Sequence, residues 1–233
     1  MGDIVKQILK SGPSGIVEQI DKMPVSIAEK TIDDIAHQKG DKFLGKVLDH
    51  LSPVKIAAIL RQHDFSCPSI ISWIMTPELI VNVLKIDPLF WKHIYNRNDP
   101  EIFIRIKNDA LGLIASILLN EKSRDRQGAI LQRISSDRLS RLYLFLPFIG
   151  WEIRENQTLE FEDSAIDPGT ADHLYEMIRW AAPCVAGQII DFVYSAETSL
   201  LYYITDLWTE VFTHFEKGRD FTSIENVMFL PID

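Results

Sequence analysis

The sequence predicts an all-α protein in which stacked short helices form an α-solenoid-like superhelix, followed by a smaller acidic helical portion. The main observation is a helix start that recurs, because residues 51–60 (LSPVKIAAIL) align without gaps on residues 75–84 (MTPELIVNVL). In both copies apolar residues follow the proline at the third, fourth, sixth and seventh positions. This spacing gives each helix one apolar stripe to bury against a neighbour.

The first helices have recognisable ends. Ser52 and Thr76 occupy the N-cap position, and Pro53 and Pro77 occupy the first helical position, where the missing N–H has no cost. A basic turn and a glycine at residues 39–40 predict a helix end. The expected helices before residue 86 span residues 3–10, 14–20, 25–37, 41–48, 53–60, 66–74 and 77–84.

The Asp-Pro pairs at residues 87–88 and 99–100 repeat the helix-start pattern. Helices that start at prolines 53, 77, 88 and 100 begin about a dozen or two dozen residues apart. This spacing is typical of an α-solenoid or a compact helical stack. Further helices are expected at residues 102–119, 124–134 and 137–148.

The character of the chain changes near residue 150. Residues 150–169 are polar, acidic and poorly periodic, so we place a domain boundary there, between a helical stack (1–150) and an acidic helical portion (151–233). A short strand is expected at residues 158–161. Helices are expected at residues 168–180, 183–194 and 198–216, before an apolar tail at 227–233.

Charge is distributed unevenly between these two parts. Residues 1–150 carry 20 Lys and Arg against 17 Asp and Glu, a net charge of +3, whereas residues 151–233 carry 4 against 16, a net charge of −12. Such a contrast indicates either two surfaces with different partners or an acidic end that packs on the basic segment of the same chain.

Composition is that of a soluble globular protein, with 46% hydrophobic and 24% charged residues. The two cysteines, Cys67 and Cys184, make no disulfide scaffold and are expected to be small core residues in a reducing compartment. The longest apolar runs are too short for a membrane span, and no secretory leader is visible. A cytoplasmic location follows.

Motifs for catalysis, metals and phosphates are weak or missing. Cys67 lies near His63 and Asp64, but the proline after it favours a buried cysteine at a helix start over a nucleophile. No phosphate-binding loop or histidine pair at helical spacing occurs, so no cofactor is expected. The weak metal candidates are the acidic residues Glu162, Asp163 and Asp167, for which a solvated acidic loop is the simpler interpretation.

Aromatic residues, including Trp73 and Trp180, mostly fall at helical spacing among aliphatic neighbours, which indicates core packing. Adjacent residues Phe90 and Trp91 differ by about 100° around a helix, so one of them is expected to mark a groove or partner surface. Nucleic acid is not expected as a partner, since the protein has an acidic isoelectric point near 5.2.

The repeated phrase at residues 51–60 and 75–84, with a fainter copy at 23–28, resembles the N-terminal helical superhelix of MgtE-type magnesium transporters and the middle region of the flagellar switch protein FliG. The resemblance covers residues 14–95 and implies an all-α scaffold that serves as an interaction module. No functional residue is carried over from it.

These observations predict a soluble, non-catalytic scaffold or regulatory protein that binds another protein. The candidate contact residues are the basic side chains Arg124, Arg126 and Arg133 and the tail residues Phe229 and Leu230. The alternative is an enzyme or metal-dependent protein with an acidic site at residues 150–175. That site would bring the acidic residues and His173 together with His63 or His50.

Overall fold

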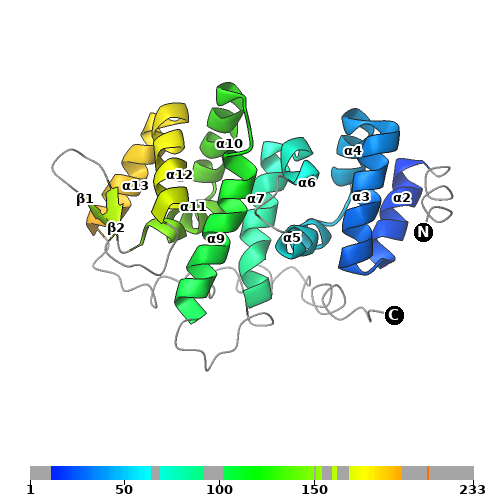
Figure 1. Ribbon diagram of the computed structural model, residues 1–233, viewed down its shortest axis with the longest axis horizontal. Helices are drawn as coiled ribbons and strands as arrows, with labels where there is room; N and C mark the ends of the chain where they lie inside the picture. Colours follow the sequence, from blue (N-terminus) through cyan, green and yellow to red (C-terminus); the bar gives the residue numbers. More distant parts are fainter. Residues whose placement is uncertain are drawn as a thin grey trace.

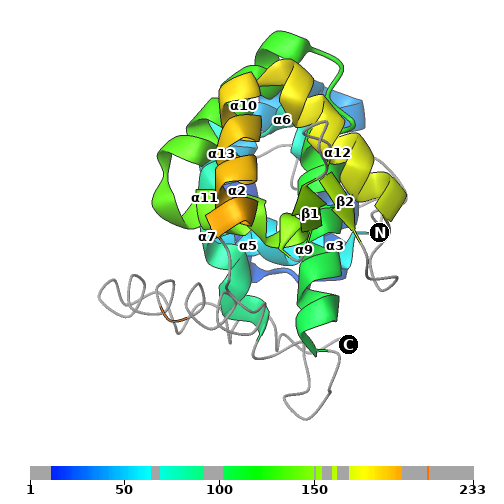
Figure 2. The same ribbon diagram turned by 90° about the vertical axis from the view of Figure 1, so that its left-hand side faces the viewer.

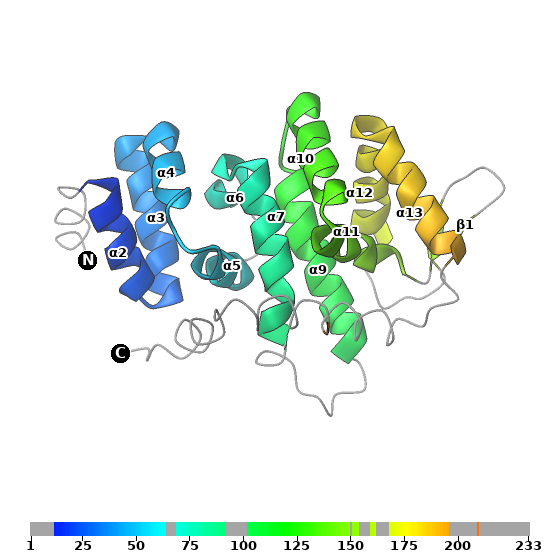
Figure 3. The same cartoon turned by 180° about the vertical axis from the view of Figure 1, so that it is seen from behind.

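A computed structural model of the protein describes residues 12–63, 69–91, 102–149, 151–153, 159–161 and 168–195, together with Thr209. The fold is all-α, as predicted, and one short β-hairpin interrupts the described helices. The helices follow one another broadly in chain order along the long axis of the molecule, and the β-hairpin lies at the end beside α13 (Figures 1 and 3). A solenoid-like superhelix remains a prediction.

Three helices form the N-terminal end, namely α2 (Pro13–Lys22), α3 (Val25–Lys39) and α4 (Asp41–Leu48). Helix α3 ends at Gly40, whose N–H donates to the carbonyl of Ala36 and whose φ of 80° is a conformation that favours glycine. This confirms the predicted glycine stop. The expected helix at residues 3–10 lies outside the described residues.

The recurring proline starts are confirmed in α5 (Pro53–Gln62) and α7 (Pro77–Ile86), and the short α6 (Ile70–Ile74) lies between them. Thr76 caps α7, because its hydroxyl accepts a hydrogen bond from the N–H of Leu79 at 3.3 Å. Ser52 occupies the same position before α5, but its side chain makes no capping hydrogen bond.

The Asp-Pro pair after α7 does not start an α-helix within the described residues. It forms a 3₁₀ turn, Asp87–Phe90, that directly continues α7. The Asp87 carboxylate does not cap a helix, because it is fully buried and binds Arg61 instead. The expectation for the adjacent aromatic pair is also wrong, since Phe90 and Trp91 are both buried. The second Asp-Pro pair, at residues 99–100, lies outside the described residues.

The middle of the molecule contains α9 (Ile102–Leu118), α10 (Arg124–Ser136) and α11 (Arg138–Phe145). The predicted helix at 137–148 changes to a 3₁₀ turn at Leu146–Phe148, where Pro147 interrupts the α-helical hydrogen bonds.

Strand β1 (Trp151–Ile153) pairs antiparallel with β2 (Leu159–Phe161), with Trp151 opposite Phe161. The second strand confirms the expectation for residues 158–161, whereas the first was not predicted. The chain continues into α12 (Pro168–Ala181) and α13 (Pro183–Ser195), the end of the molecule that faces the viewer in Figure 2. Of the helix expected at 198–216, only Thr209 is described, and it is helical.

One hydrophobic core runs through the described residues, from Ile16 in α2 to Ile189 in α13. Helix α10 packs against α7 on one side and against α12 on the other, so helices on both sides of residue 150 share this core. Cys184 is exposed, which corrects the expectation that it lies in the core. Cys67 lies outside the described residues.

A few charged side chains are enclosed with the core. Lys55 is fully buried, and its ammonium group donates to the carbonyl oxygens of Asp21 and Met23 at the end of α2. Burial lowers the pKa of Lys55, and the nearby Asp21 carboxylate partly opposes this shift. Buried Lys107 donates to the carbonyl of Ile149 in the same way.

Candidate functional site

Two large apolar side chains are exposed in the described part of the chain. Trp73 in α6 is 44% exposed and Trp180 in α12 is 58% exposed, so these two are exceptions to the core packing that the spacing predicts for most of the aromatic residues. Both contact the same short stretch of chain, residues 120–124, which comprises the end of the connection between α9 and α10 and the first residue of α10. We therefore take this connection and the two tryptophans as the candidate site.

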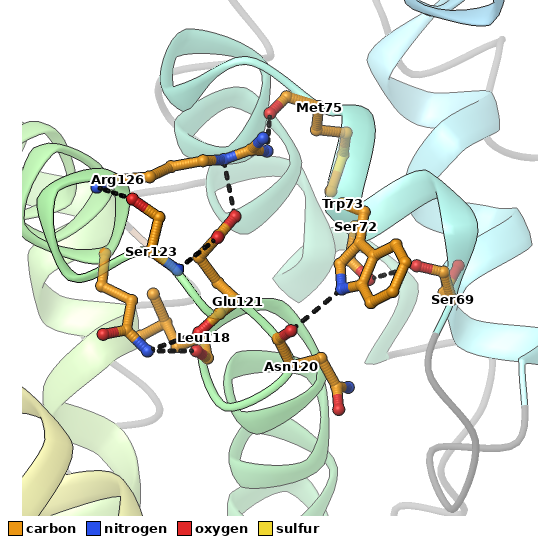
Figure 4. A network of polar contacts seen from close by, with 10 residues as sticks. Ser69, Ser72, Trp73, Met75, Leu118, Asn120, Glu121, Ser123 and Arg126 are labelled. Carbon is orange, nitrogen blue, oxygen red and sulfur yellow. Dashed lines mark hydrogen bonds and ion pairs between the residues drawn. The ribbon is translucent and has the colours of Figure 1, made fainter. Parts of the chain in front are cut away.

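Trp73 is held in place by its only polar group. Its indole N–H donates to the carbonyl oxygen of Asn120 at 3.0 Å (Figure 4). An indole has no second donor or acceptor, so the exposed part of this side chain offers only carbon to a ligand.

A cleft of about 490 Å³ lies beside Trp73. Helix α4 contributes Asp41, Lys42 and Gly45 to its wall, and α6 contributes Trp73 and Ile74. The remaining wall consists of residues 120–122 and Arg126. The cleft therefore lies between the N-terminal helices and the start of α10.

Arg126 and Glu121 fix one side of the cleft (Figure 4). The Arg126 guanidinium donates to the Met75 carbonyl at 3.0 Å and lies 2.9 Å from Oε2 of Glu121. The other oxygen of Glu121 accepts from the N–H of Ser123 at 2.8 Å. The Ser123 hydroxyl in turn accepts from the N–H of Arg126 at 3.3 Å, which caps α10.

Buried Gln127 strengthens this turn. Its amide donates to the carbonyl oxygens of Leu118 and Glu121, at 3.1 and 2.8 Å. Hydrogen bonds from the buried Gln127 side chain therefore hold the connection between α9 and α10 in place. The Asn120 carbonyl that accepts from Trp73 belongs to this connection.

Arg124, at the start of α10, contacts the second exposed tryptophan, Trp180. Its guanidinium lies 4.1 Å from the centre of the Trp180 ring and donates to the Trp180 carbonyl at 2.7 Å. This contact combines a cation–π interaction with a hydrogen bond at the end of α12. It leaves most of the indole exposed to solvent.

The three predicted arginines do not form one basic surface. Arg126 and Arg133 reach toward α6 and α7, where Arg133 lies 3.4 Å from Glu78 in an exposed ion pair. Arg124 reaches in the opposite direction, toward α12. Each of the three is engaged within the chain, and their role in partner binding remains a prediction.

The residues of the alternative site are not brought together within the described structure. His50 lies 2.8 Å from the Lys46 carbonyl, and His63 lies 2.6 Å from the Glu29 carboxylate. His173 is exposed on α12, at the opposite end of the molecule from α4 (Figure 1). Other predicted candidates lie outside the described residues, namely Glu162, Asp163, Asp167, Phe229 and Leu230.

The described residues contain no group of three or more His, Cys, Asp and Glu side chains that could hold a metal ion. None of their helices combines the length and the apolar character needed to cross a bilayer.

Comparison with known proteins identifies the family. The family model for the AtcB C-terminal domain matches residues 77–223, and the family model for the AtcB N-terminal domain matches residues 13–74. The chain belongs to the AtcB family. These matches do not bear on the likeness to the MgtE and FliG domains.

A curated relative in the AtcB family is named Adaptation to cold protein B and comes from Shewanella oneidensis. The two chains are 32% identical over 128 residues, which cover 55% of this chain and 49% of the relative. The match thus spans about half the length of that relative. No solved structure matches the chain.

The AtcB domain matches place the cleft at a junction. Trp73 and α4 belong to the region matched by the N-terminal domain, whereas residues 120–126 belong to the region matched by the C-terminal domain. The hydrogen bond from Trp73 to Asn120 therefore joins the two matched regions, and Arg126 donates to Met75, which lies between them.

The sequence contained a pattern that identifies Trp180 as exposed. In α12 the buried stripe comprises Ala171, Leu174, Tyr175 and Ile178. Trp180 follows Ile178 by two residues, which places it about 200° away around the helix. Helix α6 has only five residues, too few for a comparable period around Trp73.

Proposed function

We propose that this member of the AtcB family is a non-catalytic protein-binding module that acts in the cytoplasm and contributes to adaptation to cold. The observation that carries the proposal is the pair of exposed tryptophans, both anchored to residues 120–124. Tryptophan is enriched among the residues that dominate the energy of protein interfaces.

Preorganisation supports the same proposal. The Trp73 indole is held by its hydrogen bond to Asn120, and the Trp180 ring is covered on one side by the Arg124 guanidinium, so each ring has less conformational entropy to lose when a partner binds. The role in adaptation to cold rests on the name of the Shewanella relative.

A capture experiment tests the binding role. Immobilised full-length protein is incubated with an extract of its native host grown in the cold, and bound proteins are identified by mass spectrometry. We expect a partner that binds the wild type and is lost with Trp73→Ala or Trp180→Ala. Val17→Ala, which shortens a half-buried side chain on distant α2, should retain that partner.

The cellular role is tested in the same host. Deletion of the gene should slow growth in the cold and have little effect at the optimal temperature. Wild-type protein should restore growth, and the Trp73→Ala/Trp180→Ala double variant should not. Capture that does not depend on either tryptophan, or full rescue by the double variant, would contradict the proposal.

A further inference from the structure

We infer that the cleft beside Trp73 binds an acidic peptide segment of the partner, one in which a carboxylate side chain lies close to an apolar side chain. This inference rests on the proposed protein-binding function and specifies the chemistry that the partner presents. It follows from three properties of the cleft, namely its volume, its exposed indole and its unequal supply of unpaired charges.

The volume suits a few side chains rather than a whole protein surface. At about 490 Å³ the cleft falls within the range of about 300–1,000 Å³ typical of ligand pockets. A short segment that inserts one or two side chains would fill it, while the rest of the partner covers the rim.

The apolar part of the recognition comes from Trp73. Its N–H is already used by Asn120, so the exposed ring offers a peptide only its carbon surface and gains from contact with apolar carbon. An aliphatic, proline or aromatic side chain of the peptide is the complementary group.

The charged part comes from two lysines. Lys42 and Lys122 line the cleft, are exposed, and form neither an ion pair nor a hydrogen bond with another described residue. By contrast, both carboxylate oxygens of Glu121 are already satisfied, by Ser123 and Arg126.

One acidic side chain, Asp41, opposes these lysines in the cleft wall. It is the first residue of α4, where the positive end of the helix dipole stabilises a carboxylate. Apart from the Glu121–Arg126 pair, the cleft wall therefore carries the two lysine ammonium groups and one carboxylate, Asp41, which the helix dipole already stabilises. The protein as a whole has a net charge of −9. This local excess of positive charge selects an acidic segment over a neutral or basic one.

The test is a selection of displayed peptides. A random library of twelve-residue peptides is selected on immobilised full-length protein, after removal of peptides that bind a Lys42→Glu/Lys122→Glu variant. We expect enrichment of peptides in which Asp or Glu lies within a few residues of an apolar side chain. Both lysines are exposed, so this variant should fold normally.

The most enriched peptide is then synthesised with a fluorescent label, and its affinity is measured by anisotropy. The Lys42→Glu/Lys122→Glu variant should bind it at least about tenfold more weakly. Lys30→Glu/Lys46→Glu makes the same change of net charge at exposed positions that do not line the cleft, and it should bind like the wild type. Trp73→Phe retains an aromatic ring and should bind more tightly than Trp73→Ala.

Several results would overturn the inference. These are enrichment of neutral or basic peptides, no enrichment at all, or equal loss of binding in the two lysine double variants. A dimer of the wild type that the Lys42→Glu/Lys122→Glu variant breaks would also overturn it, because the occupant would then be a second copy of this chain. Sedimentation velocity at rising protein concentration detects that dimer.

Failure here is distinguishable from failure of the proposed function. A captured partner that depends on the tryptophans but not on Lys42 and Lys122 would leave the proposed function intact and contradict the acidic segment. A partner that depends on neither tryptophan would contradict the proposed function itself.

Discussion

The guanidinium of Arg61 donates two hydrogen bonds to the carboxylate of Asp87, at 2.5 Å from Nε and 2.6 Å from Nη2. Arg61 lies in the region matched by the AtcB N-terminal domain and Asp87 in the region matched by the C-terminal domain. The hydroxyl of Tyr143 and the indole N–H of Trp91 also donate to Asp87, at 2.6 and 3.3 Å. This buried carboxylate therefore joins α5, the 3₁₀ turn Asp87–Phe90 and α11.

Substitution of Asp87 should destabilise the protein strongly. Asp87→Ala leaves the Arg61 guanidinium, only 10% exposed, and two further donors without this acceptor. Removal of one partner of a buried ion pair costs about 3–5 kcal/mol. Urea unfolding followed by circular dichroism measures the loss. Asp87→Asn, which keeps an acceptor oxygen, should lose less.

The control for this measurement is an ion pair of the same kind on the surface. Glu18 and Lys22 lie 2.6 Å apart, but both side chains are more than 70% exposed. Glu18→Gln should leave the unfolding midpoint unchanged within error. A loss for Asp87→Ala of less than about 1 kcal/mol would show that the buried network contributes little.

Asp137 should make stability depend on acidic pH. Burial by itself would raise the pKa of Asp137, but hydrogen bonds from the N–H of Ser140 and from Lys85 outweigh it and hold the pKa below its ordinary value of 3.8. A carboxyl group whose pKa is lowered on folding stabilises the protein above its unfolded pKa, and this contribution is lost as the pH falls through the folded value.

The measurement compares wild type with Asp137→Asn. The wild type should be more stable near pH 7, and its advantage should shrink below about pH 4. Urea titrations at several pH values give this difference directly. An advantage that is constant from pH 7 to pH 3 would show that the Asp137 charge does not stabilise the fold.

The arginines of α10 should differ in their contribution to stability. Arg126→Ala removes a hydrogen bond to the Met75 carbonyl and the ion pair with Glu121, so we expect a loss of about 1–2 kcal/mol. Arg133→Ala removes only an exposed ion pair and should cost less than about 0.5 kcal/mol. Equal losses in thermal or urea unfolding would contradict this assignment.

Two helical glycines provide a matched pair of substitutions. Alanine favours a helix over glycine by about 1 kcal/mol. At Gly45 the added Cβ would lie 3.5 Å from the Ile74 side chain, an ordinary contact, so Gly45→Ala should stabilise the protein. At Gly128 it would lie 3.1 Å from the Ala181 carbonyl oxygen, so Gly128→Ala should lose most or all of that gain. Unfolding midpoints of the two variants test this difference.

Much of the fold was predictable because short stretches of sequence determine where its helices begin and end. Pro53, Pro77 and Gly40 mark helix ends through backbone geometry that neighbouring residues alone determine, and these ends were predicted correctly. The 3₁₀ turn after α7 was not predicted, because it depends on the distant Arg61 that takes the Asp87 carboxylate away from capping. Strands β1 and β2 are each three residues long, too short to show an alternating pattern, and the sequence predicts only the second of them.

The candidate site was predictable only in part. The basic start of α10 was singled out from the sequence, and Arg126 lines the cleft. Its pairing with Glu121 and the Met75 carbonyl depends on how α6 meets α10, which residue spacing does not reveal. The spacing of Trp73 among aliphatic neighbours in the expected helix at 66–74 favours core packing, whereas the helix that forms has only five residues.

The continuous core has a consequence for how partners are chosen. Because α6, α10 and α12 share that core, the separation between Trp73 and Trp180 is set by the fold. The two indoles then present two anchoring points at a fixed separation. A partner with two anchors at the matching separation would gain from a high effective concentration at the second contact, whereas a partner with one anchor would not. Selectivity would thus reside in a length as well as in a chemical match.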